Sequence, residues 1–253
     1  MVHFVGAGPG ATDLITVRGQ RLIAEADVII YAGSLVNPEL LQGAKPGCDC
    51  LDSASMTLEE VVARVEAAEA AGQTTVRLHT GDPSIYGAIR EQMDALDARG
   101  IAYDVTPGVS SFCASAAAIP AEFTLPGQSQ TVIITRMAGR TPVPEKERMR
   151  TLAAHRASMA IFLSTGLLES LSRELIEGGY APDDPAAIVY KASWPDERVC
   201  RCTVGTLAET AAREKITKTA MILVGSFLGN EYDRSLLYHP TFSHMFREAK
   251  DAD

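Results

Sequence analysis

Short apolar runs alternate with longer amphipathic stretches along the 253 residues of the chain. The apolar runs are typical of buried strands, and the amphipathic stretches are typical of helices. Strands are expected at residues 2–6, 27–31, 74–79, 101–105, 131–136, 159–163, 186–191, 199–204 and 220–225. Helices are expected near residues 16–25, 57–71, 86–99, 111–118, 167–177 and 206–215. This alternation predicts an α/β fold.

The segment from Ile119 to Gly127 interrupts the pattern with two prolines and a glycine. Such a segment is typical of a boundary between compact parts of a chain. We therefore expect an N-terminal α/β lobe at residues 1–118 and a C-terminal α/β lobe at residues 119–253, each a mixed sheet with flanking helices. A site in the cleft between two lobes is then the default expectation.

Four loops follow predicted strands, where open α/β sheets bind their ligands. They lie at residues 6–10, 80–86, 107–111 and 164–167. In the second loop, Gly81 lets a ligand approach the backbone closely. Asp82 either faces a cationic ligand or caps the following helix. His79, at the end of the preceding strand, faces either this site or the core.

The first loop invites comparison with dinucleotide-binding proteins, because Gly6 and Gly8 follow a predicted strand. The fingerprint of those proteins requires a third glycine where this chain has Ala11. Pro9 is the stronger objection, since it removes an N–H group from a loop that is meant to hold a pyrophosphate. A nicotinamide-dependent oxidoreductase is therefore the weaker of two interpretations.

The formal net charge of −9 argues against a nucleic-acid partner, which requires a clustered basic surface. It leaves room for a small acidic substrate. No apolar run approaches the roughly 18 residues that span a membrane, and the N-terminus lacks the pattern of a signal peptide. A cytoplasmic protein without a membrane partner is expected.

Four of the five cysteines form two closely spaced pairs, Cys48 with Cys50 and Cys200 with Cys202. Structural zinc sites usually separate their paired ligands by two to four residues, and neither pair has that spacer. We expect reduced, structural cysteines and no metal site.

Taken in order, the four loops resemble the tetrapyrrole methylase family, the S-adenosylmethionine-dependent enzymes of sirohaem and cobalamin synthesis. The motifs that carry the resemblance are Gly6-Ala-Gly8-Pro9-Gly10, Gly81-Asp82-Pro83 and Pro107-Gly108-Val109-Ser110. Residues 135–145 and 190–197 and the tail at 235–244 look like the branch of the family that methylates precorrin-4 or cobalt-precorrin-4 at C-11.

The resemblance implies a two-lobed fold, a homodimer, S-adenosyl-L-methionine as methyl donor, S-adenosyl-L-homocysteine as product and a small tetrapyrrole as acceptor. It implies donor-binding residues at Pro9, Thr80, Gly81, Asp82, Ile85, Tyr86, Ser110, Ser111, Thr165, Ala192, Thr219 and Ala220. Arg136 and Arg140 are the candidates for binding the carboxylates of the acceptor, because guanidinium groups form forked hydrogen bonds with carboxylates. No catalytic side chain is assigned beyond Asp82 as a candidate.

Three alternatives stay open. One is another methyltransferase of the family, acting on a different precorrin position, on uroporphyrinogen III, or in diphthamide or ribosomal-RNA methylation. The second is the nicotinamide enzyme. The third is a binding module without catalytic activity, which explains equally well why the loops contain no recognisable catalytic triad.

Overall fold

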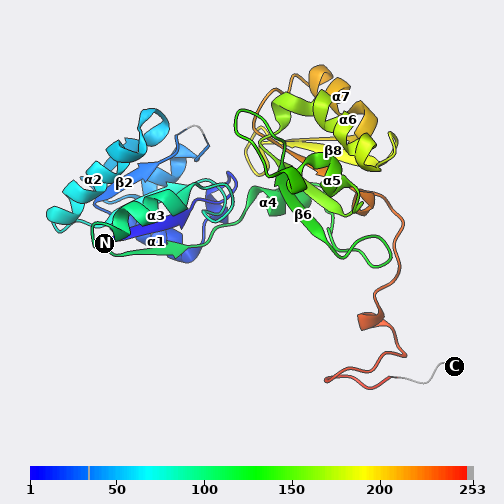
Figure 1. Ribbon diagram of the computed structural model, residues 1–253. Helices are drawn as coiled ribbons and strands as arrows, with labels where there is room; N and C mark the ends of the chain where they lie inside the picture. The colour runs from blue at the N-terminus through cyan, green and yellow to red at the C-terminus, as the bar shows by residue number, and fades with distance from the viewer. Residues whose placement is uncertain (34, 250–253) are drawn as a thin grey trace. The chain divides into compact units, whose positions relative to one another are not determined.

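A computed structural model describes residues 1–33 and 35–249 of the protein, which form two compact units (Figure 1). Of the described residues, those within Met1–Ser115 and Lys191–Arg198 form the first unit, and those within Ala116–Tyr190 and Val199–Asp253 form the second. The chain thus leaves the second unit after Tyr190, contributes one short segment to the first unit and then returns. The division into lobes at residues 118 and 119 stays a prediction.

The first unit is built on a parallel five-stranded sheet in the order β3-β2-β4-β1-β5. Its strands are β1 (Val2–Gly6), β2 (Val28–Tyr31), β3 (Asp49–Asp52), β4 (Thr75–His79) and β5 (Tyr103–Thr106). Gly6 pairs with His79, and Val5 pairs with Thr106. The carboxyl ends of β4, β1 and β5 are therefore neighbours at one edge of the sheet.

Helices cover both faces of this sheet (Figure 1). Leu22 and Ile23 of α1 (Val17–Glu25) pack against Val5, Ile29 and other strand residues on one face. On the opposite face, α2 (Leu58–Ala70) and α3 (Ile89–Asp97) pack against a second cluster. That cluster contains Val2, Phe4, Val28, Ile30, Val61, Val65, Ala68, Leu96 and Ile101.

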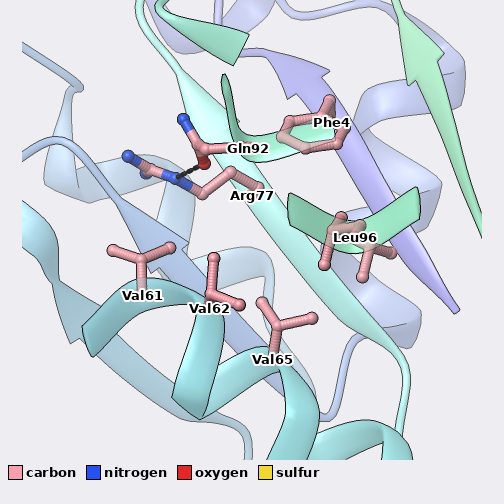
Figure 2. A pocket seen from close by; sticks show the side chains of 8 residues that line it. Phe4, Val61, Val62, Val65, Arg77, Gln92 and Leu96 are labelled. Carbon is pink, nitrogen blue, oxygen red and sulfur yellow. Dashed lines mark hydrogen bonds between the residues drawn. The ribbon is translucent and has the colours of Figure 1, made fainter. Parts of the chain in front are cut away.

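A buried arginine lies within the second cluster. Figure 2 shows Arg77 of β4 pointing between α2 and α3, beside a cavity of about 10 Å³ that has room for roughly one water molecule. Its guanidinium donates from Nε to Gln92 Oε1 and from Nη1 to the Ile30 carbonyl, both at 3.1 Å. Burial lowers the pKa of Arg77 to about 10.

His79, two residues farther along β4, is also a core residue and is only 5% exposed. Its ring centroid lies 6.0 Å from that of Phe4, and its Nε2 atom has no hydrogen-bond partner among the described residues. Burial, reinforced by the charge of Arg77, lowers the pKa of the imidazole from 6.5 to about 3. The sequence left open whether His79 faces the candidate site or the core, and the structure places it in the core.

We expect the buried histidine to make the fold sensitive to acid. Because its folded-state pKa is depressed, the unfolded chain binds the proton first, so the free energy of unfolding falls as the pH drops below about 6.5. The loss is about 2 kcal/mol at pH 5. Urea unfolding of the parent and of His79→Leu at pH 7 and pH 5 measures it, and the variant is expected to lose less stability on acidification.

The exposed His155 provides the matched control for this measurement. His155→Leu removes one imidazole without touching the first sheet, so it should reproduce the parent's loss of stability. An equal loss of stability in the parent and in His79→Leu would show that His79 does not cause the acid sensitivity.

The second unit contains a mixed five-stranded sheet in the order β6-β7-β10-β8-β9. Its strands are β6 (Val132–Arg136), β7 (Ser158–Phe162), β8 (Pro185–Tyr190), β9 (Arg198–Thr203) and β10 (Ala220–Val224). β6 and β7 are parallel, whereas β10 is antiparallel to both β7 and β8. α5 (Met149–Ala153), α6 (Leu168–Gly178) and α7 (Leu207–Arg213) bury apolar side chains in one cluster with the strands.

The expected two-lobed α/β fold is confirmed, with two differences in detail. The mixed pairing expected of both sheets occurs in the second sheet, while the four pairings of the first are all parallel. The helix expected from Tyr86 begins at Ile89, because Tyr86 and Ala88 adopt positive φ angles of 56° and 50°. No helix in the part of the chain that the structure describes is long and apolar enough to cross a membrane.

Candidate functional site

Three glycines bring the loops after β1, β4 and β5 into backbone contact. A Cβ atom on Gly108 would lie 2.1 Å from the Gly81 carbonyl oxygen and 2.8 Å from Gly6 Cα. A Cβ atom on Gly6 would lie 2.6 Å from Gly108 Cα. Real side chains do not tolerate these distances, so only glycine allows the loops to approach so closely. We call Gly6, Gly81 and Gly108 the glycine junction.

Hydrogen bonds between the loops reinforce the junction. Gly81 N–H donates to the Gly8 carbonyl at 2.8 Å, and Gly8 N–H donates to the Gly81 carbonyl at 3.2 Å. Gly108 N–H donates to Asp82 Oδ2 at 2.9 Å. The first, second and third loops are therefore joined by both contact and hydrogen bonds.

Asp82 has its two carboxylate oxygens engaged within these loops. Oδ2 accepts from Gly108, while Oδ1 accepts from Ser84 N–H at 2.9 Å and from the Ser84 hydroxyl. Partial burial raises the pKa of the carboxyl group, but the hydrogen bonds from Ser84 and Gly108 outweigh that effect and hold the pKa below its usual value. The helix-capping interpretation is wrong for α3, because its N-cap is Ala88 and no side chain caps it. The carboxylate instead ties the second loop to the third.

The rest of the second loop is tightly folded. A Cβ atom on Gly87 would lie 2.1 Å from the Pro83 carbonyl oxygen, so the chain turns back on itself there. Thr80 Oγ1 donates to the Leu35 carbonyl at 3.1 Å. Ile85 is half-buried and Tyr86 is 46% exposed, so the side chain of Tyr86 lies at the surface and not in the core.

The third loop leads into α4 (Ser111–Ala118). Ser110 is buried, and its carbonyl accepts from the N–H groups of Cys113 and Ala114 at 3.1 and 3.2 Å. The Ser115 hydroxyl donates to the Ser111 carbonyl at 2.7 Å. Ser110 therefore directly precedes α4 and Ser111 begins it, directly beside the glycine junction, and the start of a helix favours acceptor atoms of a ligand.

The first loop is held by side chains that are distant in sequence. Asn37 Nδ2 donates to the Gly10 carbonyl at 2.9 Å. Ala11 N–H donates to Ser193 Oγ, and Trp194 Nε1–H donates to the Pro9 carbonyl, both at 3.0 Å. Because the Ala11 N–H is engaged and α1 begins only at Val17, this loop does not present the helix N-terminus that holds a pyrophosphate.

Asn37, Ser193 and Trp194 were missed as site residues in the sequence. Asn37 caps the short helix at Pro38–Gly43, since the Glu39 N–H donates to Asn37 Oδ1 at 3.0 Å. Its second hydrogen bond, to Gly10, left no local signal. Ser193 and Trp194 adjoin the predicted Ala192, which is buried in the first unit.

In the second unit, three further candidates meet at one edge of the sheet. Thr165 follows β7, and its Oγ1 donates to the carbonyl of Ala220, the first residue of β10, at 3.2 Å. Thr219 precedes it with a φ of 57°, a left-handed conformation that is uncommon for a β-branched residue and often marks a functional loop. Nearby, Ser164 Oγ accepts from Met137 N–H at 2.9 Å.

Arg136 ends β6 at the same edge, since it pairs with Phe162 of β7. Its guanidinium donates to the carbonyls of Met137 and Thr141 at 3.2 Å and of Pro142 at 2.8 Å. Arg136 therefore closes the loop that follows its own strand, and Arg140 lies exposed within that loop. Across residues 1–33 and 35–249, no three His, Cys, Asp or Glu side chains gather in a metal-binding arrangement.

Comparison with known proteins assigns this arrangement to a family. The family model described as Tetrapyrrole (Corrin/Porphyrin) Methylases matches residues 1–208. The chain belongs to the tetrapyrrole methylase family. The resemblance carried by the strand-end motifs is thereby confirmed.

Among relatives of this tetrapyrrole methylase, the cobalt-precorrin-4 C(11)-methyltransferase of Methanocaldococcus jannaschii is 51% identical, over 98% of this chain and 96% of that protein. The precorrin-4 C(11)-methyltransferase of Mycobacterium tuberculosis is 47% identical, over 94% and 95%. The X-ray structure of a cobalt precorrin-4 methyltransferase matches with a TM-score of 0.89 at 47% identity, covering 90% of this chain and 96% of that one. A uroporphyrin-III C-methyltransferase from Thermus thermophilus, solved with S-adenosyl homocysteine, matches with a TM-score of 0.73 at 27% identity, covering 90% and 92%.

Proposed function

We propose that this protein transfers a methyl group from S-adenosylmethionine to C-11 of precorrin-4 or cobalt-precorrin-4 in the synthesis of cobalamin. The observation that carries the proposal is the identity of 51% and 47%, along nearly the whole chain, with proteins that bear these names. The Thermus relative supports the donor, because it was solved with the product form of S-adenosylmethionine.

The loops of the first unit fit such a donor. At the glycine junction the three loops pack through backbone alone, so no side chain at Gly6, Gly81 or Gly108 occupies the space that a ligand beside the loops would need. Ser110 and Ser111 begin α4 beside it. Asp82 fixes the relative positions of the second and third loops and adds a negative charge near a cationic donor.

S-adenosylmethionine supplies an activated methyl group on a sulfonium when bound. This chain's residues then have to bind, orient and keep water away, which is the role of fixed backbone loops. Gly81, Ser110 and Ser111 would hold the donor from the first unit, with Pro9, Thr80, Ile85, Tyr86 and Ala192 around them. Thr165, Thr219 and Ala220, which belong to the second unit, are the remaining residues proposed to bind the donor.

Arg136→Ala is expected to weaken binding of the tetrapyrrole acceptor about tenfold while leaving binding of S-adenosylhomocysteine within about twofold. Arg136 lies in the second unit and closes the loop that carries Arg140 through three hydrogen bonds. Removing the guanidinium releases that loop and also removes a charge that attracts carboxylates. Separate titrations with both ligands measure the effect.

Lys146→Ala supplies the control for Arg136, because it removes an exposed positive charge outside the loop that Arg136 closes. Its acceptor binding is expected to stay close to that of the parent. If Arg136→Ala weakens donor and acceptor binding equally, the assignment of this loop to the acceptor is wrong.

Turnover with an isotopically labelled methyl donor tests the proposed function. Precorrin-4, cobalt-precorrin-4 and uroporphyrinogen III are offered separately, and the methylated carbon is located by NMR. We expect the label at C-11 of precorrin-4 or of cobalt-precorrin-4. The form that is methylated faster is the acceptor of this protein. Label only on uroporphyrinogen III, or on another carbon, would contradict the proposal while leaving the family assignment intact.

A homodimer that acts in the cytoplasm completes the proposal. Both features rest on the family resemblance and the sequence pattern described above. Sedimentation velocity at micromolar concentration is expected to give twice the mass of 27.0 kDa.

A further inference from the structure

We propose that the Lys191–Arg198 segment is a clamp that holds the first loop in its donor-binding form, with Trp194 as the positioning residue. The chain reaches this segment after β8, yet the segment belongs to the first unit and contacts residues 9–11. The inference rests on the proposed function, because it assigns the clamp to the donor site of that function.

Two hydrogen bonds join the clamp to the first loop. The Pro9 carbonyl accepts from Trp194 Nε1, and Ala11 N–H donates to Ser193 Oγ. The Gly10 carbonyl between them accepts from Asn37 Nδ2, which lies outside the clamp. Pro9 and Gly10 are buried, so breaking any of these bonds leaves a polar group poorly solvated. The conformation of the first loop therefore depends on side chains of the clamp.

The ring of Trp194 also packs directly on the backbone of Gly10. A Cβ atom on Gly10 would lie 2.1 Å from ring atom Cδ1 and 2.2 Å from Nε1. The φ angle of Gly10 is not in the left-handed region, so the ring is the obstacle to a side chain at this position. Gly10 and Trp194 therefore form a matched pair.

The clamp is held in shape by its own charged side chains. Lys191 Nζ lies 2.7 Å from Asp196 Oδ2 and 5.5 Å from the centroid of the Trp194 ring. Ser193 N–H donates to Glu197 Oε2 at 2.6 Å. Lys191 and Ser193 adopt positive φ angles of 47° and 68°, which persist only where surrounding contacts enforce them.

This arrangement connects two parts of the predicted donor site. Ala192 lies between Lys191 and Ser193 and is only 6% exposed, so the clamp fixes its backbone together with that of Pro9. Loosening the clamp should therefore affect the donor before it affects the acceptor. Trp194 is the sole tryptophan of the chain, so its fluorescence reports on the clamp directly.

A double-mutant cycle on Gly10 and Trp194 tests the clamp. Calorimetry gives the Kd for S-adenosylhomocysteine, steady-state kinetics give the KM for each substrate, and melting temperatures show that each variant folds. Trp194→Ala is expected to raise the Kd at least about tenfold, and Trp194→Phe, which keeps the ring but loses the N–H, about threefold to tenfold. The donor KM should rise while the acceptor KM stays within about twofold.

The coupling between the two positions is the decisive part of the cycle. Gly10→Ala is expected to raise the Kd about tenfold in the parent, where the methyl group meets the ring, and less than about twofold in Trp194→Ala. Additive effects of the two substitutions on the Kd would overturn the proposal. So would a folded Trp194→Ala variant that binds S-adenosylhomocysteine as tightly as the parent.

Failure of the proposed function gives a different result. If the parent binds no S-adenosylhomocysteine, the assignment of these loops to the donor fails. Amide hydrogen exchange of the peptide covering residues 6–14 then tests whether the clamp holds the first loop. Faster exchange in Trp194→Ala than in the parent supports a clamp on the first loop, whereas unchanged exchange overturns it.

Discussion

Gly108→Ala is expected to weaken binding of S-adenosylhomocysteine about 100-fold or more and to lower the free energy of unfolding by about 1–3 kcal/mol. The added methyl group would lie 2.1 Å from the Gly81 carbonyl oxygen and 2.8 Å from Gly6 Cα. Both obstacles are backbone atoms, so no side-chain rotation relieves the clash. Calorimetric titration and urea unfolding measure the two effects.

Gly43→Ala is the matched control in the same unit. The nearest atom to its added methyl group, Ile23 Cγ2, lies 4.0 Å away, and the φ angle of Gly43 is not in the left-handed region. Donor binding and stability are expected to stay close to those of the parent. If Gly108→Ala behaves like Gly43→Ala, close contact at the glycine junction is not what shapes the donor site.

Asp82→Ala is expected to lower the free energy of unfolding by about 1.5–3 kcal/mol and to weaken S-adenosylhomocysteine binding at least about tenfold. The substitution removes the acceptor for Gly108 N–H and for Ser84. Asp82→Asn keeps one acceptor oxygen and should lie between the parent and the alanine variant. Urea unfolding and calorimetry separate the two effects.

The pH dependence of the same bonds gives a second readout. Because the folded-state pKa of Asp82 is lowered, its contribution to stability is present above the unfolded pKa near 3.8 and disappears as the pH falls below that value.

Asp183→Ala is the control for Asp82→Ala, because it removes an exposed carboxylate in the second unit, and it should leave donor binding unchanged. Parent-like donor binding by Asp82→Ala would show that the carboxylate does not organise the loops.

Local sequence signals predicted most elements of the fold because they act over one turn or one strand. The helix expected near residues 57–71 is present as α2, and Thr57 and Glu60 form a capping box at its start. The strand β3 was missed because it is short and polar, and α5 was missed because it has five residues. The start of α3 was placed too early, since nothing in the sequence marks the positive φ of Tyr86 and Ala88.

The positions of the loops could be predicted, but their connections could not. Gly81 and Gly108 were recognisable as strand-end glycines, yet their contact depends on the order of strands in the sheet. The bond from Trp194 to Pro9 joins residues 185 positions apart. Arg136 was expected to reach an acceptor, and its engagement with three carbonyls of its own loop becomes visible only in three dimensions.

The position of S-adenosylhomocysteine in a crystal structure of its complex with this protein tests the donor site most directly. We expect the ligand to contact the backbone at Gly81 and the start of α4 at Ser110, with the bonds of Asp82 and Trp194 to the loops retained. A ligand bound away from the glycine junction, with the loops after β1, β4 and β5 untouched, would contradict the assignment of these loops to the methyl donor.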